Sequence, residues 1–458
     1  MFLTLAIHKI IKHHKMKNTN SLFTLLLLLI STTLFSQKEI LQSGPMVGYS
    51  TMKEVLLWVQ TNQPAEVHFE YWNVKTPTEK IKTESATTTK TNAFVAHLLA
   101  NQLEPSEKYN YELFINNQKI DRPYPLQFES QPLWLWRGDA PDFSFATGSC
   151  TYISEEKYDR PGKPYGSEYQ IFETIAKQKP QFMMWLGDNF YLREADWNSK
   201  TGIIHRYTHT RSLPEMQAML GGMHHYAIWD DHDFGPNNSN RSFPLKKVTD
   251  QAFKNFFPNP NYIFDEGVTG HAQWADCEFF MLDNRYWRTP QKRTDIETPT
   301  ILGEDQVEWL LDALANSYAS FKFVVVGGQF LNPLIKGESH ETCAPQERKR
   351  IIEAIEKLKI NGVIFLTGDV HHSELSEYKM DNGYPLFDLT VSPLTAGTYG
   401  KGADENPLQV KGTLVAEKAF AKMEVFGSRK ERTLRITVFG SDGQEYWKKE
   451  IKAADLKF

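Results

Sequence analysis

The segment VIFLTGDVHH, residues 363–372, places an apolar run directly before a polar loop that holds one aspartate and two histidines. A helical pattern precedes it, because Pro345 opens a stretch, residues 345–358, with apolar side chains at helical spacing. The order of helix, apolar strand and Gly-containing loop occurs twice more, over residues 167–188 and 304–329. Continuous apolar strands between helices are typical of strands buried on both faces. The sequence therefore predicts an α/β layered core over residues 139–458, with its chemistry at the carboxyl ends of the strands.

The residues before this core follow a different pattern. Short runs that alternate apolar and polar residues, separated by Thr-rich turns, extend from residue 41 to about residue 135. Alternation with a period of two and no helical stripe predicts an antiparallel β-sandwich, which we assign to residues 37–138. Residues 419–451 alternate in the same way around turn signals, and we expect them to complete the core as strands.

The first 36 residues have the order of a secretory signal peptide. Four lysines precede one apolar run, residues 22–30, and small polar residues follow it. This run is too short to span a bilayer comfortably, and no cysteine follows it as a lipid attachment point. We therefore expect an exported protein, periplasmic or secreted, with no stable membrane anchor; an uncleaved anchor is the alternative.

Composition limits the partners of the chain. The 458 residues include 51 Lys and Arg against 56 Asp and Glu, a net charge of −5, so no general attraction to nucleic acid or anionic lipid is expected. A hydrophobic content of 41% supplies a buried core and excludes disorder. Three cysteines are too few for a disulfide framework, although Cys277 and Cys343 could pair and leave Cys150 free. The sequence predicts no oligomeric state.

Four polar segments follow four apolar strands, and they share a surplus of metal-ligand residue types. They are residues 147–150, 187–191, 229–233 and 368–372. A carboxylate at the end of a buried strand is costly unless it is paired or metal-bound. The repetition of this arrangement implies that a cation collects these side chains.

In order and spacing, these segments resemble the calcineurin-like metallophosphoesterases, and specifically the PhoD-like branch, known as alkaline phosphatase/phosphodiesterase D. The matching features are Cys150 where most of the superfamily has Asp-x-His, Gly-Asp-x-x-Tyr at 187–191, Trp-Asp-Asp-His-Asp at 229–233, Leu-Asp-Asn-Arg-Tyr-Trp-Arg at 282–288, and Thr-Gly-Asp-Val-His at 367–371. The resemblance covers nearly all of the chain after the leader. It implies a four-layer α/β/β/α metallophosphoesterase core preceded by a fibronectin- or immunoglobulin-like β-sandwich.

The resemblance also implies a first metal site. Asp188 corresponds to the carboxylate that both metals share, and Cys150, Tyr191 and His371 would complete the site as thiolate, phenolate and imidazole. Because a phenol has a pKa near 10, an ion that ionises it at neutral pH must be strongly Lewis acidic. This favours Fe³⁺.

A second site is implied beside the first. Asp231 stands where the wider superfamily has Asn, and Asp369 where it has His; register with the family block favours Asp231 over Asp230. Carboxylate oxygens in place of imidazole favour a hard ion such as Ca²⁺. Zn²⁺, Mn²⁺ and Mg²⁺ are the alternatives at this site.

The implied function is hydrolysis of small-molecule or polymeric phosphodiesters, with phosphomonoesters as further candidates, by attack of a metal-bound hydroxide. His232 is expected to protonate the leaving alkoxide or to hold the phosphate. Arg285 and His372 are candidates for neutralising substrate oxygens, and for Arg285 a structural salt bridge is the alternative.

Two other functions are consistent with the sequence. One is a surface protein that binds glycan or protein and carries a degenerate phosphoesterase domain. The other is a di-zinc or di-manganese phosphomonoesterase. Metal content and activity on a phosphodiester would separate these functions from the first.

Overall fold

The computed structural model describes residues 40–335 and 337–458. The predicted leader, residues 1–36, lies outside the described residues, and export stays a prediction. Within the described ranges, no helix combines the length and the apolar character needed to cross a membrane.

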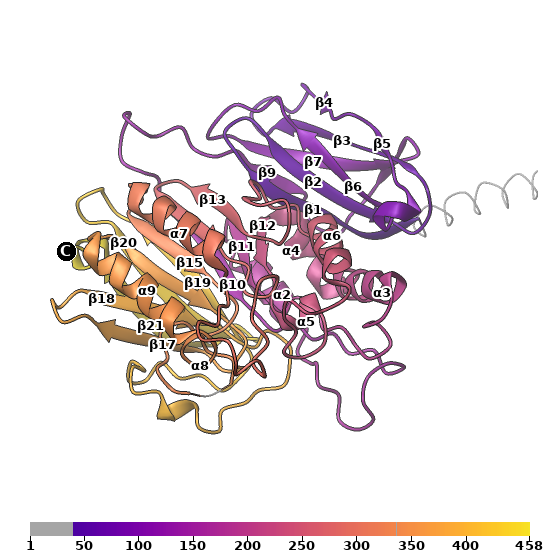
Figure 1. Cartoon of the computed structure of the whole chain (residues 1–458). Coiled ribbons are helices and arrows are strands. Elements are labelled where there is room, and N and C mark those ends of the chain that lie inside the picture. The colour runs from indigo at the N-terminus through magenta and orange to yellow at the C-terminus, as the bar shows by residue number, and fades with distance from the viewer. Residues whose placement is uncertain (1–39, 336) are drawn as a thin grey trace, which may run out of the picture.

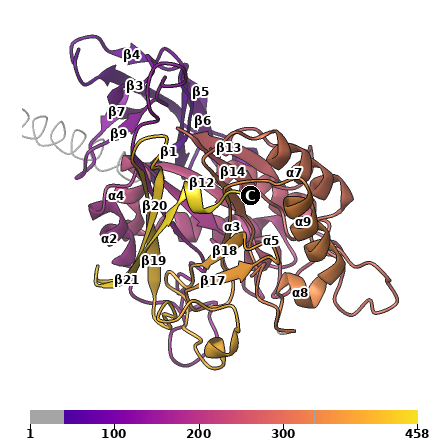
Figure 2. The same ribbon diagram turned by 90° about the vertical axis from the view of Figure 1, so that its left-hand side faces the viewer.

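Two large sheets form the centre of the molecule (Figure 1). The first has the strand order β21-β20-β19-β10-β11-β12-β1-β2-β6. Its strands are β1 (Leu41–Ser50), β2 (Val55–Thr61), β6 (Val95–Ala100), β10 (Phe143–Gly148), β11 (Phe182–Leu186), β12 (His224–Ile228), β19 (Ala419–Phe426), β20 (Thr433–Gly440) and β21 (Glu445–Lys452). Strands β10, β11 and β12 run parallel, and β19 pairs antiparallel with β10. The C-terminal strands β19, β20 and β21 thus extend this sheet beyond β10, and Figure 2 shows these yellow strands beside α2 (Ile171–Lys177).

The second sheet has the order β13-β14-β15-β16-β18-β17. Its strands are β13 (Gly270–Trp274), β14 (Cys277–Met281), β15 (Phe321–Val325), β16 (Val363–Thr367), β17 (Glu374–Lys379) and β18 (Pro385–Thr390). Strands β14, β15, β16 and β18 run parallel. Every residue of β14–β16 except Glu278 is buried, as the continuous apolar runs predicted.

The two sheets pack on each other through alternate side chains. In β11, Phe182 shares an apolar cluster with Phe279 of the second sheet, and their rings lie 5.4 Å apart. The next residue, Met183, faces the opposite side, where α2, α3 (Lys200–Arg211), α4 (Gln217–Gly222) and α6 (Lys246–Phe256) pack. Helices α7 (Glu304–Asn316) and α9 (Pro345–Lys357) lie over the second sheet (Figure 1). The predicted mixed α/β fold is confirmed.

Helix α2 is shorter than the sequence predicted. The helical pattern covered residues 167–179, but the helix spans Ile171–Lys177. Glu168 has a φ of 61°, which a right-handed helix does not contain. The apolar face of Ile171, Phe172 and Ile175 is fully buried, as expected for a helix that covers a sheet.

The N-terminal strands form two layers around a cluster of their own. Strands β1, β2 and β6 lie on one side, and the other side holds β3 (Glu66–Asn73), β4 (Ile81–Lys82), β5 (Ala86–Thr87), β7 (Lys108–Ile115), β8 (Gln118–Ile120) and β9 (Gln127–Glu129). Leu57, Phe69 and Leu113 are among the fully buried residues between them. Strand β1 also pairs in parallel with β12, with Val47 opposite His224. The first sheet therefore continues from the core into the N-terminal layers, a connection that the sequence pattern did not predict.

Candidate metal centre

The carboxyl ends of the central strands deliver the predicted ligands to one place. Cys150 follows β10, Asp188 follows β11, and Asp231 follows β12 in the first sheet. Asp369 and His371 follow β16 in the second sheet. Side chains from positions 150 to 371 therefore meet where the two sheets face each other.

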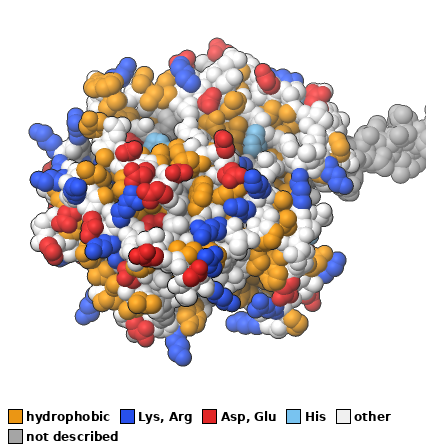
Figure 3. Space-filling model, in the orientation of Figure 1, with side chains coloured by type: hydrophobic (Ala, Val, Ile, Leu, Met, Phe, Trp, Pro, Cys, Tyr) orange, Lys and Arg blue, Asp and Glu red, His pale blue; other side chains and the backbone are white. Residues whose placement is uncertain are grey.

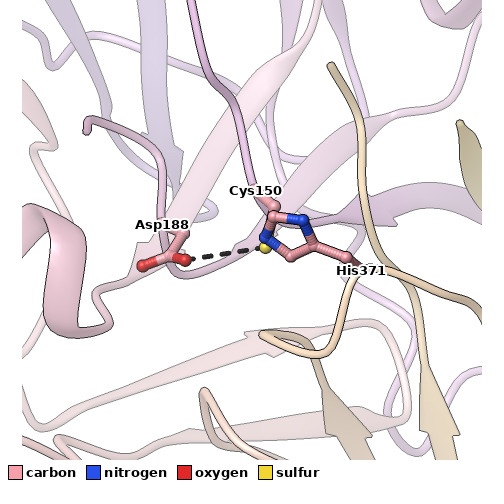
Figure 4. Close-up of side chains that lie close together, drawn as sticks. All are labelled: Cys150, Asp188 and His371. Atoms are coloured by element: carbon pink, nitrogen blue, oxygen red, sulfur yellow. Dashed lines mark hydrogen bonds between the residues drawn. The ribbon is translucent and has the colours of Figure 1, made fainter. Parts of the chain in front are cut away.

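The first group of donors surrounds Asp188. Ligand atoms of Cys150, Asp188 and His371 all lie within 4.8 Å of one another (Figure 4). The Cys150 Sγ atom lies 3.6 Å from Asp188 Oδ2. The Tyr191 hydroxyl lies 3.0 Å from the same oxygen and 3.2 Å from His371 Nε2. Sulfur, phenol, imidazole and carboxylate thus converge as the resemblance implied.

A second group lies beside the first. Asp230, Asp231 and Asp369 form one set of donors within 4.8 Å, and Asp188, Asp231 and His232 form another. Asp188 and Asp231 are therefore shared between neighbouring sets. This is the arrangement that two adjacent cations with a common carboxylate would require.

The backbone at this site is strained. Cys150, Asp188, Asp369 and His371 have φ angles of 61°, 52°, 72° and 56°, in the left-handed region that non-glycine residues rarely adopt. Such conformations cost on the order of 1–3 kcal/mol each and persist where the surrounding fold imposes them. Four of them at the predicted ligands show that the fold holds these side chains in specific positions.

Burial disfavours ionisation of the first group. It raises the pKa of Asp188 well above its usual value, and the nearby carboxylate of Asp231 adds to the shift. Burial also raises the pKa of the Cys150 thiol to about 12 and that of the Tyr191 phenol well above its usual range. A bound cation would reverse these shifts, since it stabilises each anion.

Asp231 is the exception among the carboxylates. Burial raises its pKa, but the positive charges of His232 and Arg285 outweigh this effect, and the net pKa lies below its ordinary value. Its Oδ1 atom is buried and accepts no hydrogen bond from a described residue. The same holds for Asp230 Oδ2 and Asn284 Oδ1. Buried oxygens without a donor are rare, and a hard cation satisfies them. The residues present therefore fit metal ions at both groups.

His232 and Arg285 border these groups. The His232 ring stacks on the Tyr191 ring at 4.2 Å, and its backbone N–H donates to Asp188 Oδ1. Arg285 is fully buried; it pairs with Asp230 and, at 2.7 Å, with Glu338. Its Nη2 atom, 3.7 Å from Asp231 Oδ1, has no hydrogen-bond partner among the described residues. The ion pairs with Asp230 and Glu338 therefore occupy most of the Arg285 guanidinium. This is the structural role that the sequence analysis gave as the alternative to contact with substrate.

His372 lies outside the donor groups. Its Nε2 atom is 3.8 Å from Glu374, and its Nδ1 atom is 3.1 Å from the Val370 carbonyl oxygen. Gln329 also contacts Glu374, to which its amide nitrogen donates at 2.7 Å. These two side chains belong to a buried polar network around Glu374.

Sequence reasoning missed three residues at the centre. It passed over Asp230 in favour of Asp231 and assigned no role to Asn284 or Glu338. Asn284 donates to Asp230 at 2.7 Å and lies in the 282–288 segment, so its position after β14 was an available signal. Glu338 follows no strand, and no local pattern marks it.

The possible Cys277–Cys343 bridge is absent, since Cys150, Cys277 and Cys343 are all free. Cys277 lies within β14, whereas Cys343 ends α8 (His340–Cys343) and accepts a hydrogen bond from Arg288 at 3.1 Å. The two thiols have separate packing environments.

Comparison with known proteins assigns the family. The profile of the PhoD-like phosphatases matches residues 145–437, which include every predicted site residue. The chain belongs to the PhoD-like phosphatase family. The resemblance stated from the motifs is thus confirmed. Residues 38–132 match a second family, DUF7800, a domain of unknown function.

Alkaline phosphatase D of Bacillus subtilis strain 168 is 24% identical to this PhoD-like chain over 367 residues. The aligned region spans 68% of this chain and 60% of that protein. Among solved structures, one described as the structure of PhoD has a TM-score of 0.72 at 18% identity, over 90% of this chain and 92% of the other. Purple acid phosphatase PPD1 from yellow lupin seeds has a TM-score of 0.65 at 13% identity, over 91% of this chain and 76% of the other. Both show a shared fold.

Proposed function

We propose that this PhoD-like protein hydrolyses phosphoric esters, and phosphodiesters in particular, with the aid of two metal ions. The observation that carries the proposal is a row of three adjoining donor sets, in which Asp188 belongs to the first and second sets and Asp231 to the second and third. Membership of the family supports the same chemistry.

The two donor groups differ in chemistry, which supports different ions. Cys150, Asp188, Tyr191 and His371 would hold Fe³⁺, because thiolate and phenolate suit a strongly Lewis-acidic ion. Asp188 and the second group, residues 230, 231 and 369, would hold Ca²⁺, or in its place Zn²⁺, Mn²⁺ or Mg²⁺, through oxygen atoms. When bound, such ions activate water and neutralise charge on the phosphoryl group.

The side chains around the ions would handle the leaving group. His232 faces a cavity beside Tyr191, and we assign it protonation of the leaving alkoxide. Arg285 would direct its unpartnered Nη2 atom toward the second group while its other atoms hold Asp230 and Glu338. His372 would act through Glu374, as a positioning residue.

The remaining predictions form part of the same proposal. The strand layers around residues 57, 69 and 113 support an N-terminal β-sandwich over residues 37–138, and the packing of helices on both sheets supports a four-layer α/β/β/α core over residues 139–458. Export to the periplasm or medium would follow from the leader. The face in Figure 3 mixes Lys and Arg with Asp and Glu, in keeping with small-molecule or polymeric phosphoesters rather than nucleic acid duplexes as substrates.

Metal analysis combined with turnover tests the proposal. We expect two ions per chain, a tyrosinate-to-iron absorption band, and faster hydrolysis of bis-p-nitrophenyl phosphate than of p-nitrophenyl phosphate. His232→Ala should lower turnover of an alkyl phosphodiester and retain both ions, while the control His271→Ala, on β13, should change neither. A protein without metal or activity would instead support the binding-protein alternative. Two zinc or two manganese ions and a preference for the monoester would support the phosphomonoesterase alternative.

A further inference from the structure

A cavity of about 580 Å³ opens from the candidate metal centre. Three segments line it: residues 152–165, residues 191–197, and the pair His232 and Asn237. Tyr191 and His232 belong both to the centre and to the cavity wall. A volume of this size lies within the range of small-ligand sites and far exceeds what a phosphoryl group needs. The cavity therefore has room for a larger part of the substrate.

Aromatic rings form much of its wall. Tyr152, Tyr158, Tyr165 and Trp197 line the cavity. Tyr165 is 46% exposed, and its hydroxyl lies 3.0 Å from His371 Nδ1. The Tyr152 ring meets the Tyr165 ring edge-on at 4.9 Å. Accessible rings beside a polar site are a suitable surface for a ring-shaped ligand group, since they offer large apolar contact at a small cost in side-chain entropy.

Arg193 holds the aromatic wall in place. Its guanidinium donates to Asp159 and to the Ile153 carbonyl oxygen at 2.8 Å each, and it also donates to the Tyr191 carbonyl oxygen. It lies 3.7 Å from the centre of the Tyr152 ring. Through these contacts, Arg193 connects the loop of residues 152–165 to Tyr191. The positive charge of Arg193 is already paired with Asp159.

Two other basic residues of the cavity are available to a ligand. Arg160 and Lys163 are exposed, and neither forms an ion pair with a described residue. Two acidic residues line the cavity, Asp159 and Glu194. Asp159 is paired with Arg193, which leaves the charge of Glu194 against those of the two basic residues. The unpaired charge on the wall is therefore positive, in a chain whose net charge is −5. This local excess favours an anionic group at the cavity mouth.

We infer that the cavity binds the leaving alcohol of a phosphodiester, and that this alcohol contains a ring and a further anionic group such as a second phosphate. The inference rests on the proposed phosphoesterase function. In the reaction, a water molecule releases a proton as its oxygen bonds to phosphorus, and the P–O bond to the alcohol breaks. His232 gives a proton to the alkoxide, and the proton released by the water restores His232 through solvent. Because His232 lines the cavity, the departing alcohol lies within it. Both a nucleoside phosphate and a sugar phosphate carry this chemistry.

A series of methyl phosphodiesters tests the inference on the metal-loaded protein. The leaving alcohols are ethanol, thymidine, thymidine 3′-phosphate, glucose and glucose 1-phosphate. We expect kcat/KM at low salt to rise about tenfold from ethanol to a ring alcohol, and about tenfold again with the second phosphate. The thymidine and glucose arms show which ring is preferred.

Variants assign the effects to the cavity. R160Q/K163Q should lower the advantage of the second phosphate about tenfold and leave the ethyl substrate unchanged. Trp197→Leu should lower the advantage of the ring. Lys177→Gln is the control, because Lys177, the last residue of α2, is exposed and does not line the cavity. Calorimetric titration with thymidine 3′,5′-bisphosphate should show about tenfold weaker binding to R160Q/K163Q, independently of turnover.

The outcomes separate the inference from the proposed function. If wild type hydrolyses the ethyl diester but prefers neither ring nor phosphate, or if R160Q/K163Q keeps the full preference, the inference is wrong and the function stands. If no diester is hydrolysed, the proposed function fails. The calorimetric comparison then still decides whether the cavity binds the bisphosphate.

Discussion

Acidification should weaken the junction between β1 and β12 through two buried histidines, His224 and His225. Both are 1% exposed. His224 accepts a hydrogen bond from the Glu129 N–H at Nε2 and lies 2.9 Å from the Gly48 carbonyl oxygen at Nδ1. His225 accepts from the Trp185 indole at Nδ1 and faces the Met219 carbonyl oxygen at Nε2. Each ring is thus neutral, and a second proton would point at an N–H donor.

The magnitude follows from linkage between protonation and folding. Burial lowers the pKa of His224 to about 4 and that of His225 to about 3, from 6.5. Between pH 7 and pH 5 the unfolded chain therefore binds protons that the folded chain does not, so stability falls as the pH falls. Each histidine contributes a loss of about 2 kcal/mol over this interval, and the pair about 4 kcal/mol. The loss depends little on the folded pKa values, because both lie below 5.

Urea unfolding at pH 7 and pH 5, followed by tryptophan fluorescence on chelator-treated protein, measures the effect. In H224Q/H225Q, the difference in unfolding free energy between the two pH values should shrink by about 4 kcal/mol. His205→Gln, at an exposed position, is the control and should leave the difference unchanged. Other titrating groups are common to all three proteins and cancel. An equal pH dependence in wild type and H224Q/H225Q would refute the reasoning.

Three further predictions concern the metal centre. Gly327→Ala would place a Cβ atom 2.5 Å from Asn284 Nδ2, so elemental analysis should show loss of the second ion. Gly328→Ala is the control: its added Cβ atom would have its nearest contact at 3.4 Å, and both ions should remain. Arg285→Met leaves the buried Asp230 carboxylate without a counterion, while Glu338 keeps its ion pair with Arg288 at 3.0 Å. The substitution should lower the unfolding free energy by about 3–5 kcal/mol in urea, and a loss below about 1 kcal/mol would contradict this. Cys150→Ser should retain the circular dichroism spectrum of the wild type and lose one ion per chain; two retained ions would exclude Cys150 as a ligand.

The parts of the fold that sequence predicted are those with a local signature. The strands that become β11 and β16 are predominantly apolar runs, and one glycine separates each strand from Asp188 or Asp369. Parallel strands of one sheet end at a common edge, which places Asp188 after β11 near Cys150 after β10 and Asp231 after β12, but Asp369 lies in the second sheet and reaches them only because the two sheets pack face to face. The convergence of Cys150, Asp188 and His371 was anticipated from the resemblance of the motifs to the PhoD-like branch, because strand spacing alone does not show how the two sheets face each other.

The parts that sequence did not predict depend on long-range pairing. No local pattern shows that Val47 of β1 lies opposite His224 of β12, since both are apolar-strand positions with many possible partners. The role of Arg285 likewise depends on Glu338, which reaches it from a loop without helical or strand periodicity. The cavity wall at residues 152–165 has turn-rich sequence, and its shape comes from the contacts of Arg193.

The pairing of β1 with β12 has a consequence for solubility. A fragment that began at residue 139 would lack β1, and β12, whose five residues are buried in the whole chain, would become an edge strand of the first sheet. Edges of this kind recruit strands from other molecules and lead to aggregation. The N-terminal strands thus cover an edge of the core sheet, and their removal should make the remaining chain less soluble.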